Sequence, residues 1–138
     1  MPALDKCQQQ VVNALQKEGW QLLKSPYNVF TIYRTIYIDI AMSKGQNGTQ
    51  QQIIVIEIKC FPDPNSTTRD VYTSIGQYLI YRVMLESMEM ANNLYLAVPD
   101  AIFNAVFDEA VMKVVKADRI KMVIVDLDAE AVTRWIHW

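Results

Sequence analysis

A hairpin that carries charges in its arms most constrains how this chain can fold. Residues 37–40 and 53–61 are rich in β-branched and aromatic side chains, and the polar segment between them contains the Gly and Asn residues that tight reversals need. Both stretches are therefore predicted to be strands. Because successive side chains alternate across a strand, Glu57 and Lys59 share one face of the second arm, while Ile58 lies on the other.

The pairing register decides whether Asp39 meets Glu57. In an antiparallel pair, residues that face each other have numbers with a constant sum, so these two face each other if the reversal is centred on Gly48. Their Cβ atoms then lie roughly 4.5–5.5 Å apart, which lets two carboxylates share one divalent cation. A strict two-residue turn would instead place Asp39 opposite Ile56, with its side chain on the wrong face of the sheet. The prediction therefore requires a loop with an odd number of residues, or a bulge.

Two facing carboxylates destabilise a hairpin unless a cation or the nearby Lys59 compensates their charge. The pattern indicates a metal site with an amine beside it, in which Asp39 and Glu57 hold Mg²⁺ or Mn²⁺. The ammonium of Lys59 could then activate a water and stabilise charge that develops on a phosphate, as a nuclease requires. A plain alternative stays open, because an E-x-K pattern on the solvent face of a strand is often a structural ion pair.

Length and composition limit the class of protein. The chain has 138 residues, of which 51% are hydrophobic, and this predicts one globular domain over residues 1–138. No apolar run approaches the roughly 20 residues that span a bilayer, and the N-terminus lacks an apolar segment, so we expect a cytoplasmic protein without a membrane partner. A net charge of −2 offers no excess of cations for phosphates, which argues against strong DNA binding by the chain alone.

Cysteine and histidine usage excludes several kinds of site. Cys7 and Cys60 lie far apart, without a CxxC pattern or a nearby His, and are predicted to be two reduced, mostly buried thiols rather than a zinc site or a disulfide. His137 is the only histidine and is the second-last residue. This argues against a catalytic triad and against a His-rich metal centre.

Hydrophobic periodicity and breakers predict the other elements. They are a helix over residues 2–19, a strand over 20–23, one long or two short strands over 29–42, the hairpin, a helix over 68–90, strands over 94–98 and 120–125 joined by a helix, and a last short helix after Asp128. The helix over 68–90 is the longest element, and Gln77 lies at the centre of its mostly polar stripe. The two apolar strands joined by a helix predict a right-handed βαβ unit.

An acidic strand, an E-x-K strand and a crossing helix resemble the core of the PD-(D/E)XK nucleases. More closely, the whole chain resembles the XisH family, the fdxN-element excision controlling factors of cyanobacteria. The segments that carry this second resemblance are Met1-Pro2-Ala3, Asn13-Ala14-Leu15, Gly19-Trp20, Tyr37-Ile38-Asp39, Glu57-Ile58-Lys59, Gly76-Gln77, Tyr81-Arg82, Leu94-Tyr95-Leu96-Ala97-Val98-Pro99 and Trp135-Ile136.

The resemblance implies an α/β restriction-endonuclease-like fold of three layers, with a central mixed sheet and helices on both faces. It implies that Asp39 and Glu57 hold the metal, that Lys59 assists the water, and that Gln77 supports the site. It also implies a role in excising a DNA element during heterocyst differentiation, with an XisI-type partner and the excision recombinase.

Two residues depart from the pattern. Ile38 precedes Asp39 where the superfamily has the Pro of its name, and Gln8 lies in the first helix where we expect many relatives to carry a His. Because the metal needs only the carboxylate, the missing Pro is tolerable. If a first-helix His contributed to the chemistry, this chain would lack that contribution.

Three classes of function stay open from the sequence. They are a Mg²⁺-dependent DNA endonuclease, a non-catalytic DNA-binding accessory factor of the recombinase, and a purely protein-binding regulator. The acidic balance favours weak DNA binding by the chain alone, and self-association or a complex with a partner. Six side chains of the long helix are candidate contact residues: Tyr72, Tyr78, Tyr81, Met84, Met88 and Met90. Of these, Tyr78 lies on the stripe that is predicted to face the core.

Overall fold

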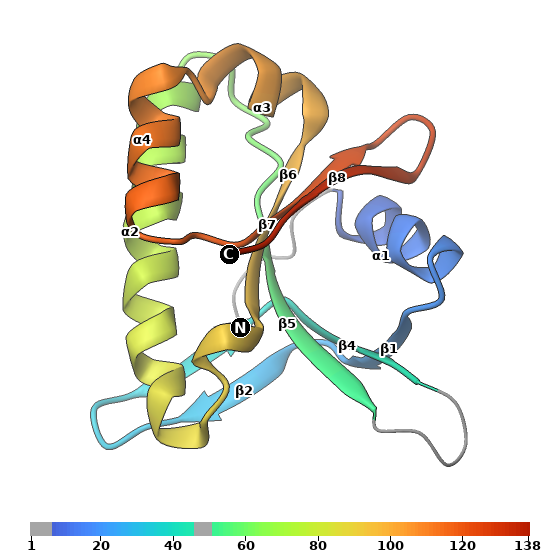
Figure 1. Cartoon of the computed structure of the whole chain (residues 1–138), viewed down its shortest axis with the longest axis vertical. Coiled ribbons are helices and arrows are strands. Elements are labelled where there is room, and N and C mark those ends of the chain that lie inside the picture. The colour runs from blue at the N-terminus through green and yellow to red at the C-terminus, as the bar shows by residue number, and fades with distance from the viewer. Residues whose placement is uncertain (1–6, 46–50) are drawn as a thin grey trace.

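A six-stranded mixed sheet forms the centre of the molecule, in a computed structural model that describes residues 7–45 and 51–138 (Figure 1). In their order across the sheet, the strands are β1 (Gln21–Lys24), β4 (Ile40–Lys44), β5 (Gln52–Ile58), β6 (Leu94–Pro99), β7 (Met122–Asp126) and β8 (Ala131–Ile136). The three strands β5, β6 and β7 run parallel, and the remaining pairings are antiparallel. The predicted central mixed sheet is thereby confirmed.

Helices make the crossovers between the parallel strands. The long helix α2 (Thr67–Leu85) connects β5 to β6, and α3 (Asp100–Val106) with α4 (Glu109–Ala117) connects β6 to β7. The sequence predicted one helix for the second crossover. It forms two because Asp108 caps α4, its side chain accepting a hydrogen bond from the backbone N–H of Val111 at 3.0 Å.

Different helices pack on the two faces of the sheet. Apolar side chains of α2 and α4 pack on one face, and those of α1 (Gln8–Lys17) pack on the other (Figure 1). Strand β5 supplies both cores by alternation, since Val55 faces α2 while Ile56 and Ile58 face α1. Glu57 therefore points to the α2 side. The start that the sequence predicted for α1, at residue 2, lies outside the described residues.

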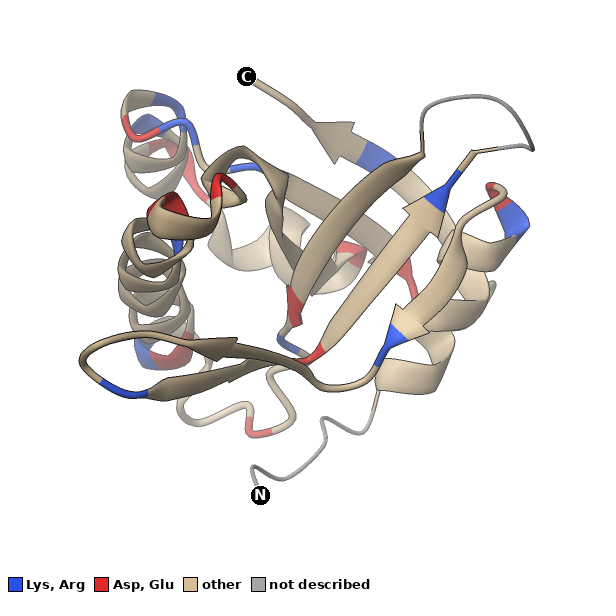
Figure 2. Ribbon diagram, turned by 90° about the horizontal axis from the view of Figure 1, so that it is seen from below, with Lys and Arg blue, Asp and Glu red and all other residues tan. Residues whose placement is uncertain are grey.

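Residues 29–42, predicted to form one long or two short strands, contribute to three strands. Strands β2 (Tyr27–Phe30) and β3 (Thr35–Ile38) form a separate two-stranded ribbon, and β4 joins the central sheet (Figure 2). The ribbon turns at Thr31, whose side-chain hydroxyl donates to the carbonyl oxygen of Arg34 at 2.7 Å. Asp39 lies at the bend between β3 and β4.

The last element is a strand, and the predicted short helix after Asp128 is wrong. The carboxylate of Asp126 accepts hydrogen bonds from the backbone N–H groups of Asp128 and Ala129, both at 3.0 Å, and so forms a turn rather than a helix cap. The chain then reverses, and the β-branched and aromatic residues of β8 pair antiparallel with β7, Trp135 lying opposite Val123.

The longest helix ends earlier than predicted. It stops at Leu85, followed by two short 3-10 turns, η1 (Glu86–Met88) and η2 (Ala91–Asn93). Glu89 has a positive φ of 56°, a left-handed conformation that ends helical geometry there. No helix in the described parts of the chain combines the length and apolarity needed to cross a membrane.

Candidate functional site

The observed pairing of β4 with β5 confirms the predicted register. Ile40 pairs with Ile56, and the pairing continues without a shift to Lys44 and Gln52. Extended by one residue, this register places Asp39 opposite Glu57. The predicted centre of the turn, Gly48, lies outside the described residues.

Glu57 is a buried acid that meets the carboxyl group of Asp39. Its side chain is only 5% exposed, whereas Asp39 is half-buried. Burial, the hydrogen bond to Asp39 and repulsion by its charge raise the pKa of Glu57 to about 9, although the Lys59 ammonium acts in the opposite direction. Glu57 is therefore protonated at neutral pH when no cation is present.

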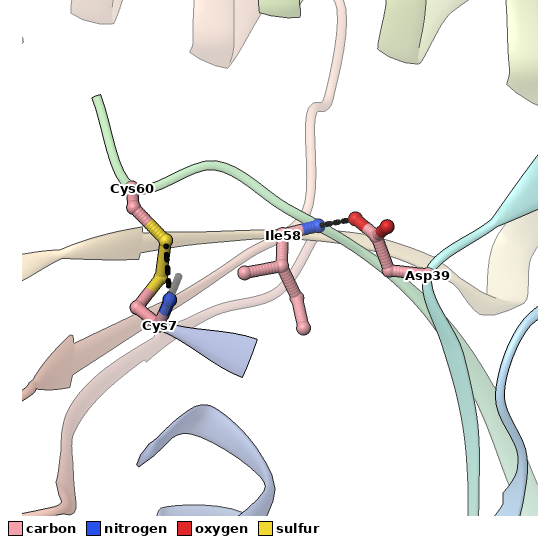
Figure 3. The surroundings of a disulfide bond; sticks show 4 residues. All are labelled: Cys7, Asp39, Ile58 and Cys60. Carbon is pink, nitrogen blue, oxygen red and sulfur yellow. Dashed lines mark hydrogen bonds between the residues drawn. A yellow bond between two sulfur atoms is a disulfide. The ribbon is translucent and has the colours of Figure 1, made fainter. Parts of the chain in front are cut away.

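A backbone contact fixes the orientation of the second acid. The Oδ2 atom of Asp39 accepts a hydrogen bond of 2.7 Å from the backbone N–H of Ile58, and Figure 3 shows the carboxylate pointing at that nitrogen. This contact joins the bend after β3 directly to the E-x-K strand. Because one oxygen of Asp39 is held by the backbone, the other can meet Glu57 or a cation.

Helix α2 presents two polar side chains toward the acidic pair. The Nε2 atom of Gln77 donates to the hydroxyl of Tyr81 at 2.9 Å. Burial raises the pKa of Tyr81, and the charges on Glu57 and Asp39 raise it further, which places this phenol within electrostatic reach of both acids. Gln77 therefore contacts Tyr81, and its own support of the acidic pair stays a prediction.

Tyr81 is the site residue that sequence reasoning assigned to a different role, as an interface residue. A signal for it was present, since Tyr81 lies four residues after Gln77 on the same polar stripe of the helix. What the stripe could not indicate was which way the helix is rotated relative to the sheet.

Lys59 lies on the same sheet face as Glu57 but farther along the strand. It lines a cavity of about 210 Å³ together with Asp70 and Thr73 of α2. Within the described residues Lys59 makes no salt bridge, so it is a cation without a fixed partner beside the acidic pair. This arrangement, with Glu57 buried, differs from a solvent-facing structural ion pair.

The two cysteines form a disulfide, and the prediction of two reduced thiols is wrong. Cys7 precedes α1 and Cys60 follows Lys59, and their Cα atoms lie 6.0 Å apart, within the range that a disulfide bridges (Figure 3). The two residues are 53 positions apart, so their spacing in the sequence gave no sign that the start of α1 meets the end of β5. The bond holds the segment that follows Lys59 against the start of α1.

Residue 8 is connected to Asp39 through one serine. The Nε2 atom of Gln8 donates to the Oγ of Ser25 at 2.8 Å, and this hydroxyl donates to the carbonyl oxygen of Asp39 at 3.2 Å. The Oε1 atom of Gln8 is buried without a hydrogen-bond partner among the described residues. The side chain at position 8 therefore influences the backbone of Asp39, not its carboxylate directly.

The donor atoms suit one kind of metal. Among residues 7–45 and 51–138 no group of three or more His, Cys, Asp or Glu side chains comes together. Asp39 and Glu57 offer hard oxygen donors, and Mg²⁺ commonly binds through one or two carboxylates while water and phosphate oxygens complete its shell. The pair fits such a cation and does not fit zinc, which takes four ligands from Cys, His and acids.

The candidate interface residues of α2 fall into two groups. Tyr78 is only 1% exposed, and its hydroxyl donates to the carbonyl oxygen of Leu94 at 2.9 Å, so it is a core residue. Met84 and Met90 pack partly against the same core, whereas Tyr72 and Met88 are exposed. Contact of the two exposed residues with a partner stays a prediction.

Fold and site together define a mixed α/β protein whose central sheet presents an Asp–Glu pair on the side of helix α2, with a lysine next to the pair. The model of one family, described as "XisH protein", matches residues 1–133, and the chain belongs to that XisH family. A search of curated proteins gives no match.

Two crystal structures are similar to the chain over nearly its whole length. One is a fdxN element excision controlling factor protein from Anabaena variabilis, and the other is an XisH family protein from Nostoc punctiforme PCC 73102. Each is 28% identical in sequence, with a TM-score of 0.82, and each match covers 96% of this chain and 100% of the solved one. The family and its fold are thus established independently of the site chemistry.

Proposed function

We propose that this protein is an excision controlling factor that acts on DNA through a Mg²⁺-dependent, nuclease-like site at Asp39, Glu57 and Lys59. The observation that carries the proposal is the buried Glu57, which faces Asp39 and has Lys59 two residues farther along the chain, a lysine without a salt bridge to any described residue. The same layout supports placing the protein among the PD-(D/E)XK nucleases, with a restriction-endonuclease-like fold. The predicted single domain over residues 1–138 is part of this proposal.

The raised pKa of Glu57 supports a cation site. A carboxylic acid that is buried against another acid is costly to ionise, and the compensation from Lys59 falls short, since the pKa stays at about 9. A divalent cation between the two groups would ionise Glu57 and remove the repulsion. When bound there, Mg²⁺ or Mn²⁺ supplies Lewis acidity and lowers the pKa of coordinated water.

The other side chains have separate roles in this proposal. Lys59 stabilises the negative charge that develops on the phosphate and orients the attacking water from its cavity beside α2. Tyr81 and Gln77 act as a hydrogen-bonded pair that positions groups opposite the two acids. The disulfide at Cys60 keeps the residue next to Lys59 in place.

The biological role is proposed from the family. The Anabaena variabilis relative is described as an excision controlling factor of the fdxN element. By this likeness, we infer that the chain assists a separate recombinase during heterocyst differentiation, in complex with an XisI-type partner.

A second function, a non-catalytic accessory factor, is favoured by one observation. With Glu57 protonated and hydrogen-bonded to Asp39, and Asp39 held by the backbone of Ile58, the acids satisfy each other without a cation. In that case the fold is kept for binding, and the acidic pair only joins β4 to β5.

The decisive experiment measures cleavage of supercoiled and branched DNA with Mg²⁺ or Mn²⁺, by the chain alone and with its XisI-type partner. Lys59→Ala should abolish cleavage while folding and metal binding stay nearly intact, because an ammonium that acts on the transition state contributes little to the ground state. Glu57→Ala should abolish both cleavage and metal binding. Lys113→Ala is the matched control, since Lys113 is an exposed lysine of α4 that pairs with Glu109.

The outcomes separate the two functions. Cleavage by the wild type and by Lys113→Ala, lost in both site variants, supports the nuclease. Cleavage that persists in Lys59→Ala and Glu57→Ala comes from elsewhere and contradicts it. If no protein cleaves and Lys59→Ala is merely less stable, the accessory function replaces the nuclease.

A further inference from the structure

The β2–β3 ribbon exposes large apolar and aromatic side chains to solvent. Phe30 is 75% exposed, Ile32 92% and Tyr33 76%, and Tyr37 is 41% exposed on the same outer face as Phe30. The inner face carries Val29 and other residues that pack into the core below α2. The inner face of the ribbon is thus packed against the core, and its outer face exposes aromatic side chains to solvent.

The ribbon begins beside the acidic pair. Its base is the pair Tyr27 and Ile38, and the next residue after Ile38 is Asp39. Figure 2 shows the two strands extending from the edge of the central sheet as a narrow arm. The base of the ribbon therefore lies one residue from Asp39 along the chain.

Charge indicates which partner suits this surface. No acidic residue occurs between Glu18 and Asp39, although the chain carries 15 Asp and Glu residues in all, whereas Lys24 and Arg34 both lie in this stretch. Both cations are exposed, and Arg34 lies at the turn of the ribbon. A segment without carboxylates that carries cations and aromatic rings is compatible with a polyanion that has exposed ring faces.

The small number of cations on this segment also indicates whether it suits paired or unpaired DNA. Two cations give little of the phosphate attraction by which proteins hold intact duplex. Aromatic side chains stack on unpaired bases directly, whereas in a duplex the base faces are covered and must first be unstacked. The ribbon therefore suits unpaired bases better than paired ones.

We propose that the outer face of the β2–β3 ribbon binds unpaired bases of DNA next to the phosphate that a cation at Asp39 and Glu57 would hold, so that the site selects forked or mismatched DNA over intact duplex. This inference rests on the proposed action of the site on DNA. Phe30, Tyr33 and Tyr37 supply the stacking rings, and Arg34 contacts the backbone.

The test compares binding of a forked and a fully paired labelled DNA of equal length, by fluorescence anisotropy at low salt without divalent cations. The wild type should prefer the fork, and Phe30→Ser and Tyr33→Ser should each weaken fork binding about 5- to 150-fold, the equivalent of roughly 1–3 kcal/mol per stacked base. Duplex binding should change little. Tyr72→Ser is the matched control, because Tyr72 is a tyrosine of α2 that is 60% exposed and lies outside the ribbon.

Several results would overturn the inference. Equal affinity of the wild type for fork and duplex would do so, as would fork binding that survives in both ribbon variants. If the ribbon variants bind DNA normally but shift sedimentation from a dimer or a complex to a monomer, the face is a protein interface instead. Circular dichroism and thermal unfolding confirm that the variants are folded, as expected for substitutions of exposed side chains.

Cleavage of the same two DNAs with Mg²⁺ separates this inference from the proposed function. Fork-selective binding lost in the ribbon variants, without cleavage by any protein, supports the ribbon and removes the nuclease. Cleavage that depends on Lys59 but is equal on fork and duplex supports the nuclease and removes the ribbon.

Discussion

Glu57 is held where its charge is unfavourable, and this decides how the site responds to pH. Its pKa is about 9 in the folded chain and near 4.5 when unperturbed, with burial as the first cause and Asp39 as the second. Between these two pH values the folded state keeps a proton that the unfolded state has lost. The stabilisation is therefore complete below about pH 4.5 and is lost as the pH rises through 9.

The pH dependence of unfolding is expected to report this proton directly. Without divalent cations, the free energy of unfolding should fall with rising pH by at most about 1.4 kcal/mol per unit from this one group. Glu57→Gln is the matched control, because the amide stays neutral and the slope should disappear. Chemical denaturation at a series of pH values measures both proteins, and identical slopes in the two would show that Glu57 is not the group that titrates.

Added Mg²⁺ is part of the same measurement. Since the cation binds the ionised pair and releases the proton, its stabilising effect should grow with pH in the wild type and be absent in Asp39→Ala. An equal shift in both proteins at every pH would remove the metal from this site.

The sequence predicted the acidic pair because strand alternation and register depend on few residues. Once β4 and β5 are strands, a loop with an odd number of residues or a bulge places Asp39 opposite Glu57, and the observed pairing has that register. The role of Tyr81 was not predictable in the same way. Its place depends on the rotation of α2 on the sheet, which is set by packing of many side chains and not by a local pattern.

At the scale of elements, the disulfide joins two parts of the fold that are remote in sequence. It fixes the start of α1 to the segment after β5, and the backbone N–H of Cys7 also donates to the Sγ of Cys60 at 3.2 Å. Helix α1 covers the sheet face opposite the acidic pair. The disulfide therefore links α1, which covers one face of the sheet, to the end of β5, which carries the candidate site on the opposite face.

Loss of this bond is expected to lower stability. Cys7→Ser should reduce the free energy of unfolding by about 2–4 kcal/mol, because a cross-link between distant residues restricts the unfolded chain. The wild type in dithiothreitol should lose a similar amount, while the same reductant should leave Cys7→Ser unchanged. Alkylation in denaturant, read by mass spectrometry, counts the free thiols. Two modified cysteines in the unreduced wild type would contradict the bond.

Elements whose local pattern agreed with their tertiary setting were predicted, whereas the last strand was not. The strands β6 and β7 are continuous apolar runs that only a buried parallel sheet accommodates, and the sequence placed both. The segment after Asp128 contains too few residues to separate a helical period from a strand period. Its pairing with β7 makes this segment a strand, and the local sequence does not predict that tertiary contact.

At the scale of the whole molecule, several of the cations in the described chain that might attract DNA are already engaged by hydrogen bonds to backbone carbonyl groups. Arg82 donates to the carbonyl oxygen of Asp118 at 2.6 Å, Lys121 to that of Asn92 at 2.7 Å, and Lys17 to a carbonyl oxygen of the turn before β8 at 2.8 Å. Figure 2 shows the basic residues spread over the molecule rather than gathered on one face. The net charge of −2 adds a weak repulsion of phosphate.

The isolated chain is therefore expected to bind duplex DNA weakly and with a shallow dependence on salt. If Lys24, Arg34 and Lys59 carry the phosphate contacts, the logarithm of the binding constant should fall with the logarithm of salt concentration with a slope of about −2 to −3. A complex with an XisI-type partner should bind more tightly and with a steeper slope, because the partner would add phosphate contacts. Titrations of duplex DNA at several salt concentrations, with and without the partner, measure both quantities. Tight binding by the isolated chain at physiological salt would mean that this chain carries its own DNA-binding surface, and the partner would then not be needed to hold the duplex at the acidic pair.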